Sequence, residues 1–265
     1  MRAYTTAHLS LPLPEGHPFP LYKYGGVAEA LKGLLPVLPA PEVPREALFL
    51  AHEASYLEKL FGEGLSREES LRLGLPFSQA LLRRALHAAG GTLAAALDAL
   101  KTGLGLNLSG GTHHAYPDKG SGFCVFNDAA VCARLMQAEW SRSHRQPLAV
   151  AIIDLDVHQG NGTAHIFRDD PTVFTLSLHG AKNFPFRKEA GDLDVGLPDG
   201  TGDSDYLAAL DAALMQLDGH CKPQLVFFLA GADPHEGDRL GRLKLSFQGM
   251  QSRDQRVLDW CLSRR

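Results

Sequence analysis

Two aspartates and a histidine alternate with apolar residues in the segment Asp154-Leu155-Asp156-Val157-His158. Side chains two residues apart on an extended strand point to the same side, so the three polar side chains can share one face. A carboxylate and an imidazole can bind one divalent transition metal, and a third ligand leaves a coordination position open for catalysis. Asp233, which also follows a short apolar run, is the candidate third ligand. Aspartates that cap helices or fill turns are the alternative interpretation.

Two adjacent histidines, His113 and His114, follow the glycine pair Gly110-Gly111. Glycines favour a tight turn that presents both imidazoles, which are groups suited to acid-base chemistry near neutral pH. A chance surface pair is the alternative. If Asp156, His158 and Asp233 suffice as metal ligands, Asp154 can orient one histidine and raise its basicity. Asn161 can orient the other.

Three phenylalanines are candidates for the wall of an apolar substrate channel. Phe123 follows Gly122 in a glycine-rich segment, where the backbone can approach a ligand closely. Phe184 and Phe186 come shortly after the segment 176–180. Packing in the core is the alternative for each of them.

The elements that must position these residues are read from short apolar runs. Runs at 148–153, 173–178 and 225–230 lack alternation, which is typical of strands buried on both faces of a parallel sheet. Helices are expected at 127–142, 162–168 and 204–217, and strand-helix alternation predicts an α/β fold. Ligands of such sheets bind beyond the carboxyl ends of the strands, and the candidate residues follow those ends directly.

The chain before these runs reads as mostly helical. Residues 45–61 and 78–100 are expected to form helices, and Gly90-Gly91 within the second is expected to mark close helix packing. The first 45 residues are rich in proline and can hold only short elements, including a short helix at 27–35. We expect one domain over residues 1–265.

Composition excludes several classes of protein. The 265 residues are 45% hydrophobic and 21% charged with a net charge of −4, so the chain has the profile of a globular protein without a positive field for nucleic acid or anionic membranes. It has no apolar run of membrane-spanning length, no evident signal peptide, and four scattered cysteines, so we expect a cytoplasmic protein in a reducing compartment. The motifs of phosphate-binding loops, HExxH zinc proteases and serine-hydrolase elbows are absent.

Five blocks together resemble the histone deacetylase family of the arginase/deacetylase superfamily. They occur in that family's order and span nearly the whole chain, and the segment GHPFPLYKY (16–24) is similar to the start of class IV deacetylases and their bacterial relatives. The blocks are GGTHHA (110–115), GFCVFNDAA (122–130), DLDVHQGNGTA (154–164), LSLHG (176–180) and AGADPHEGD (230–238). The resemblance implies a single α/β domain with a central parallel sheet flanked by helices.

The resemblance also implies a metal-dependent hydrolase that removes acetyl or other acyl groups from acetyl-lysine or small acetylated amines. Asp156, His158 and Asp233 match the family's metal ligands, with Zn²⁺ or Fe²⁺ as the ion. His114 matches the general base, and His113 matches its electrostatic partner held by Asp154. The remaining matches concern the channel wall and a structural K⁺ site: Gly122 and Phe123, with Phe184 or Phe186, and Asp154, Asp156, His158, Ser177 and Leu178.

Two positions depart from the family's pattern. Asn161 stands where many members have aspartate, and an amide carries no charge to raise the basicity of His114. The family's oxyanion-donating tyrosine, in a turn after the last core strand, has no match, since no tyrosine follows Tyr206. We therefore expect the last strand and terminal helix of the family's domain to be missing. Loss of one oxyanion donor typically costs 10²–10³ in rate, so low activity is expected.

Two further functions stay open at this point. One is a relative that binds metal and acetylated ligands without turnover, which the missing tyrosine favours. The other is a two-metal hydrolase of the arginase type, which needs extra carboxylates near the DxDxH segment. The sequence does not name the physiological substrate or the oligomeric state.

Overall fold

The computed structural model describes residues 1–264. The chain groups into two compact units, which begin at Met1 and at Ser143. Each unit contains its own parallel sheet, so the expected central sheet is divided into one of three strands and one of four. The α/β class with parallel strands flanked by helices is confirmed. The assignment of residues 1–265 to one domain stays a prediction.

Unit 1 combines a small sheet with mostly helical chain. Its sheet has the order β2-β1-β3, with all strands parallel. The strands are β1 (Ala3–Thr5), β2 (Val37–Pro39) and β3 (Leu106–Asn107). The helices are α1 (Tyr22–Ala30), α2 (Arg45–Leu48), α3 (Ala54–Phe61), α4 (Arg67–Leu73), α5 (Gln79–Thr102) and α6 (Asp128–Ser141).

The long helix α5 is the centre of unit 1. Ser78 caps its N-terminus by accepting a hydrogen bond from the Leu81 N–H group (3.1 Å), and Gly103 ends it in the left-handed conformation. A Cβ atom at Gly90 would lie 2.1 Å from the carbonyl oxygen of Pro41. The glycine pair therefore marks close packing as expected, but against an extended segment rather than another helix.

The helix expected at 45–61 is two helices, α2 and α3, with a break between them. The N–H group of Glu53 donates to the carbonyl of Pro117 instead of to a helical carbonyl. The His52 ring lies at Tyr116 O (3.0 Å) and accepts from the Asn127 N–H group (3.0 Å). These long-range bonds outweigh the local helical pattern. The short N-terminal helix begins five residues earlier than expected, at Tyr22.

Unit 2 has a four-stranded parallel sheet of order β6-β5-β4-β7. The three predicted strands are present as β4 (Val150–Asp154), β5 (Val173–Gly180) and β7 (Leu225–Leu229). The sequence reading missed β6 (Leu193–Leu197), whose apolar residues alternate with polar ones, and α9 (Phe247–Leu262). The other helices are α7 (Asn161–Phe167) and α8 (Asp203–His220).

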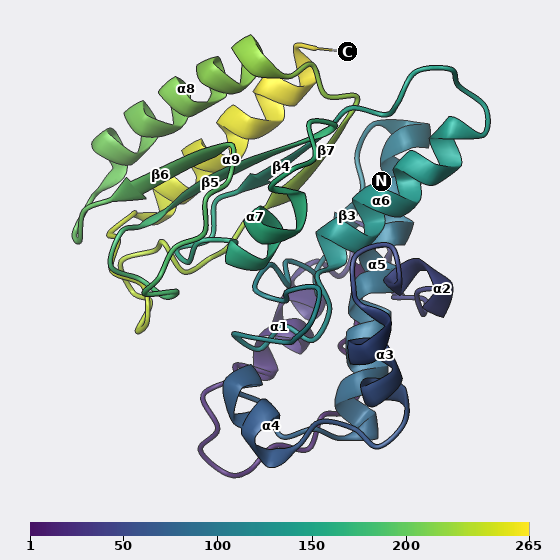
Figure 1. The fold of residues 1–265 in the computed structure, drawn as a ribbon. Coiled ribbons are helices and arrows are strands. Elements are labelled where there is room, and N and C mark those ends of the chain that lie inside the picture. Colours follow the sequence, from purple (N-terminus) through teal and green to yellow (C-terminus); the bar gives the residue numbers. More distant parts are fainter. Residues whose placement is uncertain (265) are drawn as a thin grey trace. The chain divides into compact units, whose positions relative to one another are not determined.

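Both faces of this sheet are covered, which explains its continuous apolar strands. Figure 1 shows α8 and α9 next to each other on one side of the sheet, and α7 on the other. Ala151 and Ile153 of β4 belong to a buried cluster with side chains of α8 and α9, whereas Ile152 lies with Ala164 of α7 beside a small cavity. In register, Asp154 is paired with Ser177 on β5 and Leu229 on β7, so β4 and β7 end at the same level and β5 continues to Gly180.

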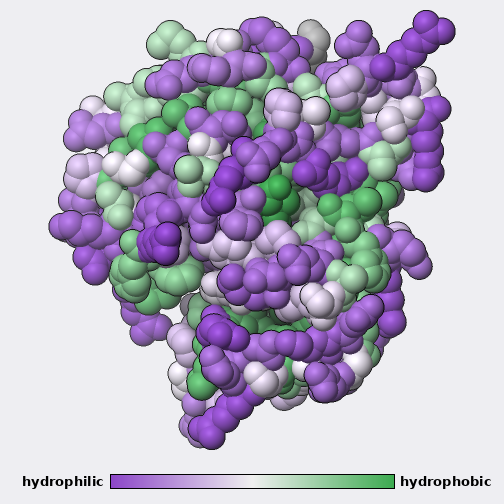
Figure 2. All heavy atoms as spheres, in the orientation of Figure 1, coloured by the Kyte–Doolittle hydropathy of each residue, from purple (hydrophilic) through white to green (hydrophobic). Residues whose placement is uncertain are grey.

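Surface composition agrees with a globular chain. The face in Figure 2 is covered mostly by hydrophilic residues, with hydrophobic residues showing between them. Among residues 1–264, no helix is both long enough and apolar enough to cross a membrane. All four cysteines are thiols; Cys124 and Cys132 of unit 1 are buried, and Cys221 and Cys261 of unit 2 are partly exposed.

Candidate metal centre

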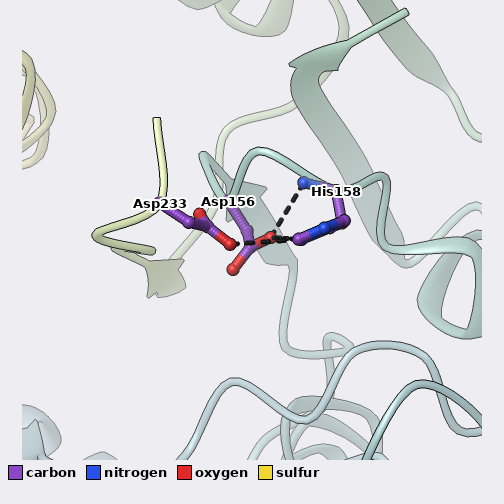
Figure 3. A group of neighbouring side chains, drawn as sticks. All are labelled: Asp156, His158 and Asp233. Atoms are coloured by element: carbon purple, nitrogen blue, oxygen red, sulfur yellow. Dashed lines mark hydrogen bonds and ion pairs between the residues drawn. The ribbon is translucent and has the colours of Figure 1, made fainter. Parts of the chain in front are cut away.

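Asp156, His158 and Asp233 of unit 2 come together at the carboxyl ends of β4 and β7 (Figure 3). Each offers one potential ligand atom, and these atoms all lie within 4.8 Å of one another. The Nδ1 atom of His158 is 2.9 Å from Asp156 Oδ1 and 3.1 Å from Asp233 Oδ2. The side chains are about one-fifth exposed, so solvent and ligands can reach them.

A tight loop, rather than a continued strand, brings the first two of these residues together. Strand β4 ends at Asp154, whose Oδ1 atom accepts a hydrogen bond from the Asp156 N–H group (3.1 Å). Asp156 in turn accepts from the His158 N–H group (2.8 Å). The expectation that alternation along a strand places all three side chains on one face is therefore wrong beyond Asp154. Successive carboxylate-to-amide bonds shape the loop instead.

Asp233 is tied to the same loop from β7. Its Oδ1 atom accepts from the Val157 N–H group (2.9 Å), which leaves Oδ2 beside His158. Gly231 is required for this approach, because a Cβ atom there would lie 2.6 Å from Asp156 Oδ2 and 2.7 Å from Asp156 Cα. The two loops therefore touch through backbone.

The electrostatics of the three side chains suit a cation. Burial disfavours a charged imidazole, but hydrogen bonds to Asp156 and Asp233 outweigh it and raise the pKa of His158 to about 10. Burial, and then the neighbouring charge of Asp156, raise the pKa of Asp233 to about 6. Two carboxylates this close repel each other unless a positive charge lies between them. Two carboxylates and one imidazole are also ligands that Zn²⁺ and Fe²⁺ accept, so the donor set fits a divalent transition metal.

The histidine pair lies in unit 1, in the turn before α6. The rings of His113 and His114 are 4.0 Å apart between centroids, and both side chains are buried. Gly111 has φ = +83°, a conformation that favours glycine, as the sequence predicts. A Cβ atom at Gly122 would lie 2.4 Å from His114 Cδ2, so a second glycine is needed where the chain passes over the ring.

A buried carboxylate holds this turn. Asp128, the first residue of α6, accepts from the N–H groups of Gly111 (3.0 Å) and Thr112 (2.8 Å). It also accepts from the hydroxyls of Thr112 (2.7 Å) and Thr92 (2.6 Å). Asn127, which caps α6, donates to the carbonyls of His113 and Ala115 (both 3.4 Å). Both sides of the histidine pair are therefore fixed through main-chain atoms.

Comparisons with known proteins identify the family of this chain. The histone deacetylase domain model matches residues 17–265. The chain belongs to the histone deacetylase family. It is 44% identical to an uncharacterized protein of Picosynechococcus sp. over 261 residues, which cover 95% of this chain and 84% of that protein. It is 33% identical to histone deacetylase 2 of Arabidopsis thaliana over 258 residues, covering 91% of this chain but 65% of that protein.

A solved structure supports the same fold. The HDAC homolog from Aquifex aeolicus superposes with a TM-score of 0.78 at 22% identity, covering 98% of this chain and 76% of that one. At this identity the likeness concerns the fold alone.

The phenylalanines predicted to line a substrate channel differ in their surroundings. Phe123 has φ = +67°, donates its N–H to Leu73 O (2.7 Å) and contacts Phe19 edge-on, with ring centroids 5.5 Å apart. Phe184 lies edge-on to His158, with centroids 6.5 Å apart, whereas Phe186 is 87% exposed. Of the two alternatives for the second wall, Phe184 is the one beside a candidate ligand.

Of the residues of unit 2 predicted to orient the histidines or to hold K⁺, Asp154, Asn161, Ser177 and Leu178 are buried. Asp154, Thr163, Thr175 and Ser177 line a small cavity, and the Ser177 hydroxyl lies 2.9 Å from His179 Nδ1. Asn161 begins α7 and is buried. The histidine pair belongs to unit 1 and these residues to unit 2, so the contacts expected of Asp154 with His113 and of Asn161 with His114 stay predictions. The K⁺ site, with Leu178, also stays a prediction.

The sequence did not single out three polar residues whose hydrogen bonds hold the candidate site segments. Asn127 and Asp128 hold the histidine turn, and Arg253 donates to main-chain carbonyls beside the candidate ligands. The FND segment could have been noticed, because Asn before Asp at a helix start is a typical capping pattern. For Arg253 the sequence offers no such signal, since it lies in a polar helix among other charged residues.

Proposed function

We propose that this chain is a metal-dependent deacetylase that hydrolyses acetyl-lysine or a related acetylated amine. The observation that carries the proposal is the convergence of Asp156, His158 and Asp233 on one small, partly exposed volume. Family membership, with a domain model matching residues 17–265 across both units, supports the substrate class and treating residues 1–265 as one deacetylase-like domain. Zn²⁺ or Fe²⁺ as the ion and a cytoplasmic location are part of the proposal.

The ion, when bound, would polarise the amide carbonyl and lower the pKa of water toward neutrality. The chain's own residues would supply proton transfer and orientation. His114 would accept a proton from the attacking water and return one to the leaving amine, which amide hydrolysis requires. His113 would stabilise the charge that develops beside it, with Asp154 as its carboxylate partner. Phe123 and Phe184 would exclude water from the acyl-lysine stem.

The close packing of the two buried imidazoles suits a pair in which one transfers a proton and the other stabilises charge. Their ring centroids are 4.0 Å apart, so a positive charge that develops on one ring acts on the other. The asparagine at position 161 would orient its histidine without adding negative charge, which keeps that imidazole less basic than an aspartate would.

The test is deacetylation of a fluorogenic acetyl-lysine peptide by metal-reconstituted protein. We expect turnover with about one metal ion per chain, and a loss of at least about 10³ in rate in Asp156→Ala, because a ligand and its charge are removed. Asp169→Ala, an exposed aspartate of the same unit, is the matched control and should be unchanged.

Other results of the same assay would favour one of the two alternative functions. About one bound metal ion per chain without turnover would favour a relative that binds metal and acetylated ligands only. Tyr206, the last tyrosine in the sequence, is buried in the core of unit 2, so it is a poor replacement for the family's oxyanion donor. About two metal ions per chain would favour the arginase-type hydrolase.

A further inference from the structure

Arg253 of α9 is buried at 1% exposure although its guanidinium carries a permanent charge. Taking a charged group out of water is costly, and an apolar side chain of similar volume is often tolerated equally well in such a place. Arg256, one turn further along the same helix, instead has a partly exposed side chain that reaches Leu207 O and Asp211 of α8. The buried charge therefore requires an explanation in what it contacts.

One nitrogen of Arg253 connects the two loops that carry the candidate ligands. Its Nη1 atom donates to the carbonyl of Leu155 (3.1 Å) and to the carbonyl of Gly231 (2.7 Å). Leu155 immediately precedes Asp156, and Gly231 lies two residues before Asp233. The other side of the guanidinium, Nε and Nη2, is held by Asp254 Oδ1 at 2.8 and 2.7 Å.

The position of Arg253 is itself fixed by the packing of α9. Ser246 caps this helix and donates its N–H to Asp203 at the start of α8 (2.8 Å). Val257 and Trp260 of α9 belong to the buried cluster between the helices and the sheet. The packing of α9 therefore fixes the position from which the Arg253 guanidinium reaches the end of the sheet.

We propose that Arg253 is a positioning residue for the proposed metal site. By holding the carbonyls of Leu155 and Gly231 on one nitrogen, it sets the separation of the Asp156 and Asp233 carboxylates before any ion binds. Asp156 and Asp233 lie on separate loops, and the hydrogen bonds of Arg253 join these loops through main-chain atoms, so this link does not depend on the ion. This inference rests on the proposed function, because it concerns the same ligands.

The test compares Zn²⁺ affinities of metal-free full-length variants by competition with a chromophoric chelator. Loss of residues that orient metal ligands typically weakens binding 10–100-fold, and we expect about that loss in Arg253→Met. Arg253→Lys keeps the charge and one donor nitrogen, so its affinity should lie between those of Arg253→Met and the wild type. Arg256→Met, on the same helix, is the matched control and should change affinity less than about twofold.

A second readout separates positioning from a general role in packing. In metal-free Arg253→Met, amide hydrogen exchange should speed up at Val157, whose N–H donates to Asp233, while the amides of α9 stay protected. Exchange that speeds up along α9 and leaves Val157 unchanged would contradict the proposal.

The other possible Zn²⁺ affinity results would each contradict the positioning role of Arg253. Wild-type affinity in Arg253→Met would overturn it, as would wild-type affinity in Arg253→Lys if the methionine variant does not fold. A wild-type protein that takes up no Zn²⁺ would overturn the proposed function, and this inference with it. Zn²⁺ uptake by the wild type with unchanged Arg253 variants would overturn this inference alone.

Discussion

The turn that carries His113 and His114 and the loop that carries Asp156 and His158 are both fixed through main-chain atoms, but by groups of opposite charge. In unit 1, main-chain N–H groups donate to the carboxylate of Asp128. In unit 2, main-chain carbonyls accept from the guanidinium of Arg253. Each buried charge is satisfied in part by main-chain groups of the segment that it holds, two N–H groups for Asp128 and two carbonyls for Arg253.

The carboxylates of the two regions differ in the groups that they contact. Asp128 accepts hydrogen bonds from four donor groups and lies at the N-terminus of α6, where the helix dipole favours a negative charge. Asp156 and Asp233 instead face each other across one imidazole. A carboxylate satisfied by neutral donors indicates a structural role, and two partly exposed carboxylates that share one imidazole indicate a place for a cation.

The comparison predicts its largest effect at Asp128. Replacing it with alanine removes the acceptor of two main-chain N–H groups and two hydroxyls. Donors that water cannot reach cost about 1–3 kcal/mol each when unsatisfied, whereas Gly111 is exposed and contributes less. We expect Asp128→Ala to lower the free energy of unfolding by about 4 kcal/mol, measured by urea denaturation. Asp118→Ala, at a half-exposed side chain of the same unit, should change it by less than about 0.5 kcal/mol. A loss below about 1 kcal/mol for Asp128→Ala would contradict the comparison.

Acid should weaken unit 1 through His52. Burial disfavours a charged imidazole and lowers the pKa of His52 from 6.5 to about 4. Its Nε2 atom accepts from the Asn127 N–H group, and a proton on that nitrogen would displace this bond. A lowered folded-state pKa means that the unfolded chain binds more protons between pH 6.5 and 4. The stability is therefore complete above pH 6.5 and falls, by about 3 kcal/mol, as the pH drops to 4.

The pH dependence is measured by urea denaturation at a series of pH values. His52→Gln, which does not titrate, should show a flatter profile across this window even if it is less stable at neutral pH. Equal slopes for the wild type and the variant would rule out His52 as the source.

The smallest predicted effect is at Asp156. In metal-free protein, Asp156→Asn removes one of two neighbouring carboxylate charges, but it also removes a charged partner of the His158 imidazole, while keeping an oxygen that can accept from the His158 N–H group. We expect the free energy of unfolding to change by less than about 1 kcal/mol, while Zn²⁺ affinity is lost. A destabilisation as large as that of Asp128→Ala would show that the two carboxylates have the same structural role.

What the sequence predicted well depends on residue type and local pattern. The buried strands β4, β5 and β7 are continuous apolar runs, and the acidic and histidine residues that follow them are chemically distinctive. What it missed depends on contacts between distant segments. Arg253 lies 98 residues from Leu155, its partner, and the break between α2 and α3 arises from bonds to residues 116–127. Strand β6 was missed because its apolar residues alternate instead of forming a run.

The four thiols differ in exposure between the two units. Burial raises the pKa of Cys132 in unit 1, and Cys124 is also buried, so an alkylating reagent reaches either only when that unit opens. Cys221 and Cys261 in unit 2 are partly exposed and are available in the folded chain. The alkylation rates of Cys124 and Cys132 would therefore report the opening of unit 1 in the wild-type protein, without introduced cysteines.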